Sequence, residues 1–354
     1  IAKEDIQMMF GETPATDITI VDESTFTVKV PSLTTFGEIP LSMTIHGVEM
    51  NMGGYAAFEI LASPVITSVE TDNKFSSKAV QVGNTVTIKG TGFRNSTISS
   101  ATFGGQDLNY TVVSDTEITA SVSEQCAEGE DVITFKFDDV VVDVVSSDKL
   151  NMLKAGSDIS DYILTNVKQP FESKEGKTSG HCTPVGWKFN YGAGNDGFCH
   201  NESEIEMPGE GLYMNDQGGL LVIQSGWEGR SKKMNGKMFQ IFNIPQGIYD
   251  VVIDVAELAT SGGGRKKAGL FISKGGEEQT PNMDASGNWT ENTNLLKSVD
   301  FYKLGETYNE NYKDRRFVIE NLTIDYEGET TLGFAVHFDS NRALKISSIK
   351  VLLK

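Results

Sequence analysis

The feature of this sequence that most constrains its fold is a two-residue alternation of apolar and polar side chains in short runs. Clear runs cover residues 25–30, 85–89 and 249–255, and turn-forming Gly, Asn, Asp and Pro separate them. Such alternation turns one side of a strand toward a core and the other toward solvent. Helical periodicity is nearly absent, apart from a short turn expected at 158–164. The sequence therefore predicts an all-β protein built of sandwiches.

The length and the first residues bear on how the chain is organised. A chain of 354 residues is too long for one ordinary core and suits two or three domains. The first twelve residues lack the basic and apolar regions of an export signal, and they resemble the middle of a strand pair. We therefore expect the chain to begin inside a domain, with any signal or lipid anchor upstream. No run of 18 apolar residues occurs, so no membrane-spanning segment is expected.

The charge balance limits the classes of partner. The formal net charge is −19. Nucleic acids and anionic membranes require clustered Lys and Arg, so neither is expected as a partner. The acidity fits a neutral ligand or a cation, although it also serves solubility alone.

An internal repeat gives the first family resemblance. A stretch that begins at Phe10 and ends on an alternating strand at 41–45 recurs between Phe103 and residue 137. The second copy carries the motifs PVITSV, GNTVTIKGTGF, ATFGG and SDTEITASV, and it resembles the IPT/TIG family of immunoglobulin-like sandwiches over 64–148. The first copy, 1–62, resembles a truncated member. The resemblance implies tandem spacer domains, with Gly90 and Gly92 at a tight turn that needs positive φ or close strand approach.

A second resemblance covers the C-terminal half. The segment MFQIFNIPQGIYDV at 238–251, with strands at 331–338 and 345–353, resembles galactose-binding-like jelly-rolls. The whole layout resembles Bacteroidetes surface lipoproteins encoded near polysaccharide-uptake systems. This implies the extracellular face of the outer membrane, an oligosaccharide or polysaccharide as partner, and an outer-membrane importer complex. The expected division is an IPT/TIG-like domain at 1–62, another at 63–150, a linker at 151–171 and a jelly-roll at 172–354.

Aromatic residues place the expected ligand site in the last domain. All three tryptophans follow residue 151. Trp227 and Trp289 lie in polar, Gly-rich loops, where a flat ring can stack on a sugar; the alternative is that they cap the ends of the sandwich. Trp187 alternates with Phe189 and is expected in the core. The candidate ligand-binding residues are Trp227, Trp289, Tyr191, Asn195, Asp196, Arg230 and Arg265.

The cysteines and acids leave several structural alternatives. A disulfide between Cys182 and Cys199 is the first interpretation, and free buried thiols are the second. A zinc site that also uses His181 and His200 ranks third, because adjacent strand residues point to opposite faces. Cys126 has no evident partner. Structural calcium is a further option implied by the jelly-roll resemblance, with Glu172 and Asp339 as oxygen donors.

Catalytic motifs are missing from the sequence. It contains no G-x-S-x-G elbow, no H-E-x-x-H pair and no P-loop. We therefore expect a non-catalytic glycan-binding protein. The alternatives are a surface adhesin or structural protein that binds another protein, and a glycosidase, which would need two carboxylates about 5–10 Å apart across a cleft.

Overall fold

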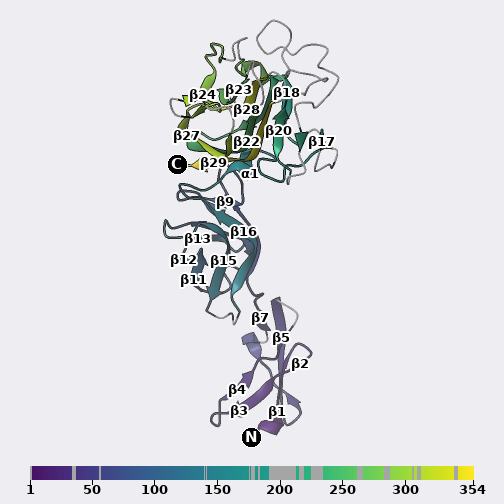
Figure 1. The fold of residues 1–354 in the computed structure, drawn as a ribbon. Helices are drawn as coiled ribbons and strands as arrows, with labels where there is room; N and C mark the ends of the chain where they lie inside the picture. The colour runs from purple at the N-terminus through teal and green to yellow at the C-terminus, as the bar shows by residue number, and fades with distance from the viewer. Residues whose placement is uncertain are drawn as a thin grey trace. The chain divides into compact units, whose positions relative to one another are not determined.

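The computed structural model is almost entirely β-sheet, which confirms the predicted fold class (Figure 1). It describes residues 2–33, 37–55, 57–138, 140, 142–174, 176, 180–181, 184–190, 213–214, 219–224, 234–260, 266–282, 288–304, 307–308, 312–338 and 342–354. The chain separates into two compact units, residues 1–73 with 77–152 and residues 74–76 with 153–354. Among the described residues, no helix has the length and apolar character that crossing a bilayer requires.

The first repeat copy forms one small sheet and a separate hairpin. The sheet has the order β2-β1-β5-β6, with β7 also paired to β5, and the hairpin joins β3 to β4. Within the described part of 1–62, three apolar side chains are buried, Ile6, Phe10 and Ile39. The elements are η1 (Lys3–Asp5), β1 (Ile6–Phe10), β2 (Thr13–Pro14), β3 (Thr16–Ile20), β4 (Phe26–Lys29), β5 (Gly37–Ile45), β6 (Val48–Glu49), η2 (Gly53–Tyr55) and β7 (Ala57–Ile60).

The second copy is a complete two-sheet sandwich. One sheet has the order β13-β14-β10-β8 and the other β12-β11-β15-β16-β9. Phe93, Phe103 and Phe135 lie in the core between them, and the free thiol of Cys126 is buried there too, 3.3 Å from the carbonyl of Phe103. The strands are β8 (Val65–Thr71), β9 (Ala79–Val80), β10 (Val86–Thr91), β11 (Ile98–Phe103), β12 (Gln106–Asp107), β13 (Asn109–Ser114), β14 (Glu117–Ser121), β15 (Gly129–Phe137) and β16 (Val144–Met152).

Gly90 and Gly92 fill the roles expected for the turn after β10. Gly92 adopts φ +76°, and its N–H donates to the carboxylate of Asp115 at 3.1 Å. A Cβ at Gly90 would lie 2.0 Å from the carbonyl oxygen of Val65 and 2.4 Å from the Phe93 ring. Gly92 is therefore suited to the turn by its backbone conformation, and Gly90 because a side chain would not fit there.

The C-terminal unit is a second sandwich of two antiparallel sheets, which we call the front sheet and the back sheet. The front sheet has the order β18-β21-β28-β23-β24 and the back sheet β20-β29-β22-β27. The front strands are β18 (Lys188–Asn190), β21 (Met234–Asn243), β23 (Lys266–Lys274), β24 (Leu295–Asp300) and β28 (Glu329–Phe338). The back strands are β20 (Leu221–Gln224), β22 (Gly247–Thr260), β27 (Tyr312–Ile324) and β29 (Arg342–Leu353). The smaller elements are α1 (Ser160–Ile163), β17 (Gly180–His181), β19 (Tyr213–Met214), η4 (Glu277–Gln279), β25 (Lys303–Leu304) and β26 (Thr307–Tyr308).

The predicted strands of this unit are confirmed. Residues 238–251 run through β21, a tight turn and β22, and the two C-terminal runs lie in β28 and β29. The hydroxyl of Tyr249 donates to the carbonyl of Pro245 at 2.6 Å, which ties the turn to the strand that follows. Burial of this ring raises the pKa of Tyr249 to about 12.

The segment expected as a linker, 151–171, carries contacts of its own. The short helical turn predicted within it is present as α1. Side chains of Ile159, Val167 and Phe171 are buried. The N–H of Ile159 donates to the carbonyl of Val351 at 2.8 Å, and the N–H of Ile349 donates to Val167 at 2.7 Å. Residues after Met152 therefore extend the back sheet along the edge of β29, and the four-part division of the chain stays a prediction.

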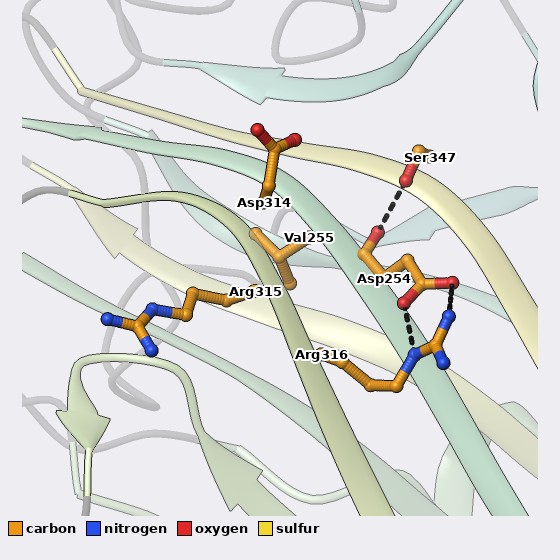
Figure 2. Close-up of a pocket in the computed structure, with 6 residues that line it drawn as sticks. All are labelled: Asp254, Val255, Asp314, Arg315, Arg316 and Ser347. Carbon is orange, nitrogen blue, oxygen red and sulfur yellow. Dashed lines mark hydrogen bonds and ion pairs between the residues drawn. The ribbon is translucent and has the colours of Figure 1, made fainter.

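The outer face of the back sheet carries cross-strand ion pairs. Acids on β22 meet bases on its neighbours: Asp250 contacts Lys354, Asp254 contacts Arg316, and Glu257 contacts Lys345. The Asp254 pair is bidentate, with Arg316 Nε and Nη2 at 2.7 and 3.0 Å from the two carboxylate oxygens (Figure 2). The largest effect on the pKa of Asp254 is this hydrogen bonding, which lowers it from its ordinary value of 3.8.

The close approach at Gly90 gives a stability prediction. The Gly90→Ala substitution forces a methyl group against backbone, and we expect residues 64–152 to lose about 2 kcal/mol or more of unfolding free energy. Urea unfolding followed by hydrogen–deuterium exchange of peptides from this sandwich measures the loss. Gly54→Ala is the control, because nothing lies within 4 Å of its Cβ position. Equal stability of the two variants would contradict the close approach.

The Asp254 pair gives a pH prediction. A carboxyl whose pKa is lowered in the folded state stabilises that state above the unfolded pKa, and the contribution disappears as pH falls through the folded pKa. We expect Asp254→Asn to cost about 1 kcal/mol at pH 7 and clearly less near pH 2.5, measured by urea unfolding at both. The control is Asp314→Asn, since Asn suits the φ of +51° at that position. A loss that does not change with pH would refute the assignment.

Candidate functional site

The front sheet is packed on both of its faces, although only one of them faces the back sheet. Phe334 on β28 lies 6.1 Å from the ring of Phe301, which in turn lies 4.9 Å from Phe317 of the back sheet. Because successive positions along a strand alternate between its faces, Gly333, Ala335 and His337 lie on the opposite, outer face. Ala335 and His337 are nevertheless buried.

A connection between two front strands covers part of this outer face. Residues 275–294 join β23 to β24, and their described part brings Trp289 against a cluster of Phe239, Phe271 and Ala335. The Trp289 ring meets Phe271 at 6.1 Å between centroids and 72° between planes. The residue as a whole is half-buried.

Glycines in the sheet make room for these rings. A Cβ at Gly269 would lie 2.8 Å from Cζ2 of Trp289. A Cβ at Gly333 would lie 2.5 Å from Cβ of Phe239 and 2.7 Å from Cζ of Phe271. The indole therefore rests directly on the backbone of β23, in a position that a larger residue at 269 would block.

Charged side chains adjoin the glycine under the indole. Asp300 on β24 is the cross-strand partner of Gly269, and Lys267 lies two residues before it on the same face. Lys267 Nζ is 3.7 Å from the Asp300 carboxylate, and each side chain keeps about a quarter of its exposure, 25% and 28%. The backbone N–H of Tyr302 holds the carboxylate at 2.8 Å. An aromatic ring, an ammonium and a carboxylate thus share one stretch of surface.

A pocket on the outer face of the back sheet is the other candidate. It encloses about 400 Å³ and is lined by Asp254, Val255, Asp314, Arg315, Arg316 and Ser347 (Figure 2). The Asp254 carboxylate is engaged by Arg316 and also accepts from the hydroxyl of Ser348 at 2.7 Å. In Figure 2 the side chain of Arg315 points away from this pair. The six lining residues include no aromatic ring that could stack on a sugar, so we favour the front sheet.

Hydrogen bonds act on the acidity of four described carboxyls. Those with resolved pKa shifts are Asp22, Asp148, Asp250 and Asp254, and hydrogen bonds lower the pKa of each. The acid of a glycosidase needs a raised pKa instead.

The structure also bears on the calcium option. Within the described ranges, no three His, Cys, Asp or Glu side chains gather as a metal site would require. Glu172 is exposed, and its backbone N–H and C=O are bonded to the side-chain amide of Asn166. Asp339 lies outside the described residues.

The predicted site residues divide into those that the structure describes and those that it does not. Trp289 is described and lies on the outer face of the front sheet. Trp187 is 3% exposed and stacks on Phe334 at 5.8 Å, which confirms its expected place in the core. The residues outside the described ranges are Trp227, Tyr191, Asn195, Asp196, Arg230, Arg265, Cys182 and Cys199.

Sequence reasoning missed the residues that surround Trp289. Asp300 and Lys237 resemble ordinary strand residues in the sequence. Lys267 ends a Gly-rich, basic segment whose sequence favours a loop tip, whereas the structure places it on β23. One signal was present: in 331–338 the inner positions are large, whereas the outer ones include Gly333 and Ala335. Small residues alternating with large ones in a buried strand indicate that something packs closely over the second face.

Comparisons with known proteins give one family match and several distant structural likenesses. The SGBP-B protein of the Bacteroides ovatus mixed-linkage glucan utilization locus, solved with a heptasaccharide, is 11% identical, with 98% of this chain and 69% of that one covered at a TM-score of 0.23. The surface glycan-binding protein PbSGBP-B from Prevotella bryantii is 12% identical, with 99% and 91% covered at 0.21. The K3 cleaved adhesin domain of Lys-gingipain from Porphyromonas gingivalis W83 is 12% identical, with 52% and 98% covered at 0.29.

The family match concerns the second repeat copy. No curated protein sequence matches the chain. The IPT/TIG domain family matches residues 64–148, the range that the sequence motifs predict. The matched residues coincide with the two-sheet sandwich of the second copy.

Proposed function

We propose that this chain binds a polysaccharide or oligosaccharide without cleaving it, through the outer face of the front sheet. The observation that carries the proposal is the half-buried indole of Trp289, which rests on Gly269. The C–H face of a sugar ring stacks on such a surface. The Lys267–Asp300 pair supplies a donor and an acceptor for the hydroxyl groups around that ring.

The rest of the chain has a supporting part in this proposal. The immunoglobulin-like copies act as spacers between the binding domain and the cell. The resemblance of the chain to surface lipoproteins of polysaccharide-uptake systems supports a place on the extracellular face of the outer membrane. An importer in the same membrane is the partner that would receive the bound oligosaccharide.

Trp289 gives the direct test. We expect Trp289→Ala to weaken polysaccharide binding at least about tenfold, equivalent to about 1.4 kcal/mol, because the stacking surface is lost. Affinity-gel electrophoresis of the full chain against a panel of neutral and acidic polysaccharides measures the effect. Trp227→Ala tests the second sequence-predicted ring in the same gels.

Controls separate loss of binding from loss of folding. Val318→Ala changes an exposed side chain on the back sheet and should migrate as the parent does. Trp289→Phe keeps an aromatic ring and should retain part of the affinity. Parent chain that no polysaccharide retards would reject glycan binding and leave the protein-binding adhesin as the alternative. Release of reducing ends from a retarding polysaccharide would show an enzyme instead.

A further inference from the structure

A lysine ammonium is buried on the outer face of the front sheet. Lys237 lies on β21, where its cross-strand neighbours are Asn190 on one side and Ala335 on the other. The residue is only 8% exposed. Burying an ammonium is costly unless its N–H groups donate to oxygens. The acceptors of Lys237 therefore indicate which part of the chain it holds in place.

The acceptors belong to the connection that carries Trp289. Lys237 Nζ lies 2.7 Å from Thr280 Oγ1, 2.7 Å from Asn282 Oδ1 and 3.4 Å from the carbonyl of Thr280. The Thr280 hydroxyl donates onward to the carbonyl of Glu277 at 2.7 Å. The Lys237 ammonium therefore attaches the connection between β23 and β24 to a third strand, β21.

Hydrogen bonds continue from this anchor to the residue beside the indole. The N–H of Thr290 donates to the carbonyl of Asn282 at 2.8 Å, and the N–H of Asn282 donates to the Thr290 hydroxyl at 3.3 Å. The Asn292 amide closes the base of the connection on the carbonyl of Gln279 at 3.1 Å. Thr290 directly follows Trp289, so a short path of hydrogen bonds links the Lys237 ammonium to the backbone next to Trp289.

We propose that Lys237 is a positioning residue for glycan binding, which holds Trp289 in the orientation that stacks on a sugar; this rests on the proposed function. The side chain is covered by the connection and acts through Asn282 and Thr290 rather than on the ligand. Gly269 and Phe271 fix the indole from below. Lys237 fixes the chain segment that carries this indole.

A double-mutant cycle tests this role. Lys237→Met keeps the length and apolar stem of the side chain and removes its donors. We expect it to weaken polysaccharide binding at least about fivefold in the parent, and less than about twofold in the Trp289→Ala background. Lys350→Met, at an exposed position on the back sheet, is the matched control and should leave affinity unchanged.

A second readout does not depend on any ligand. In the Lys237→Met chain, the amides of Asn282 and Thr290 should exchange with deuterium at least about tenfold faster, while amides of β22 keep their protection. Should this variant fail to fold, Asn282→Ala removes an acceptor instead, and Asn282→Asp, which keeps one, should restore binding.

The outcomes separate the two proposals. Parent chain that binds no polysaccharide rejects the proposed function, and the positioning role falls with it. Parent chain that binds while Lys237→Met binds equally well rejects the positioning role alone. Equal losses from Lys237→Met in both backgrounds would also reject it, because the lysine would then act independently of Trp289.

Discussion

The C-terminal sandwich depends on one constraint, which is that β28 is buried on both faces. Of its ten residues, all but the first are buried. A strand at the centre of an antiparallel sheet with one wet face would alternate between apolar and polar residues. Here one face carries Phe334 and Phe338, and the other carries Gly333 and Ala335. The difference in size fixes what each face receives: interlocking side chains from the back sheet on one, and flat rings against the backbone on the other.

The two outer faces of the sandwich consequently have different chemistry. On the back sheet, acids of β22 meet bases of the neighbouring strands in partly exposed pairs such as Asp254–Arg316. On the front sheet, apolar rings and a folded-over connection exclude water, and the Lys267–Asp300 pair lies at the margin of that covered area. Of these two outer faces, the front one combines an aromatic ring with a hydrogen-bonding pair in its described part.

Sequence reasoning predicted more of the fold than of the candidate site. Alternation and turn residues located β10, β15 and β22, because the two-residue period is a local property of the chain. The resemblance to jelly-rolls located β21, β28 and β29. The same local view separated Trp187, which alternates with Phe189, from Trp289 in its polar loop. It could not find Lys237 or Asp300, since their roles arise from register between strands far apart in sequence. The contacts of 153–171 with β29 are equally non-local, and polar stretches within that segment resembled a linker.

Rigidity of the aromatic ring follows from these packing arrangements and bears on how a weak ligand is held. Contacts between a sugar and a protein are individually modest, so any ordering of loops at the moment of binding would offset much of the gain. In this sandwich Trp289 is already ordered when the chain folds. Gly269 leaves room for the ring, Phe271 packs against it, and the Asn282–Thr290 hydrogen bonds hold the backbone next to it. The buried ammonium of Lys237 is stable only while the connection lies over it. Its burial therefore couples the position of the indole to the stability of the whole front sheet.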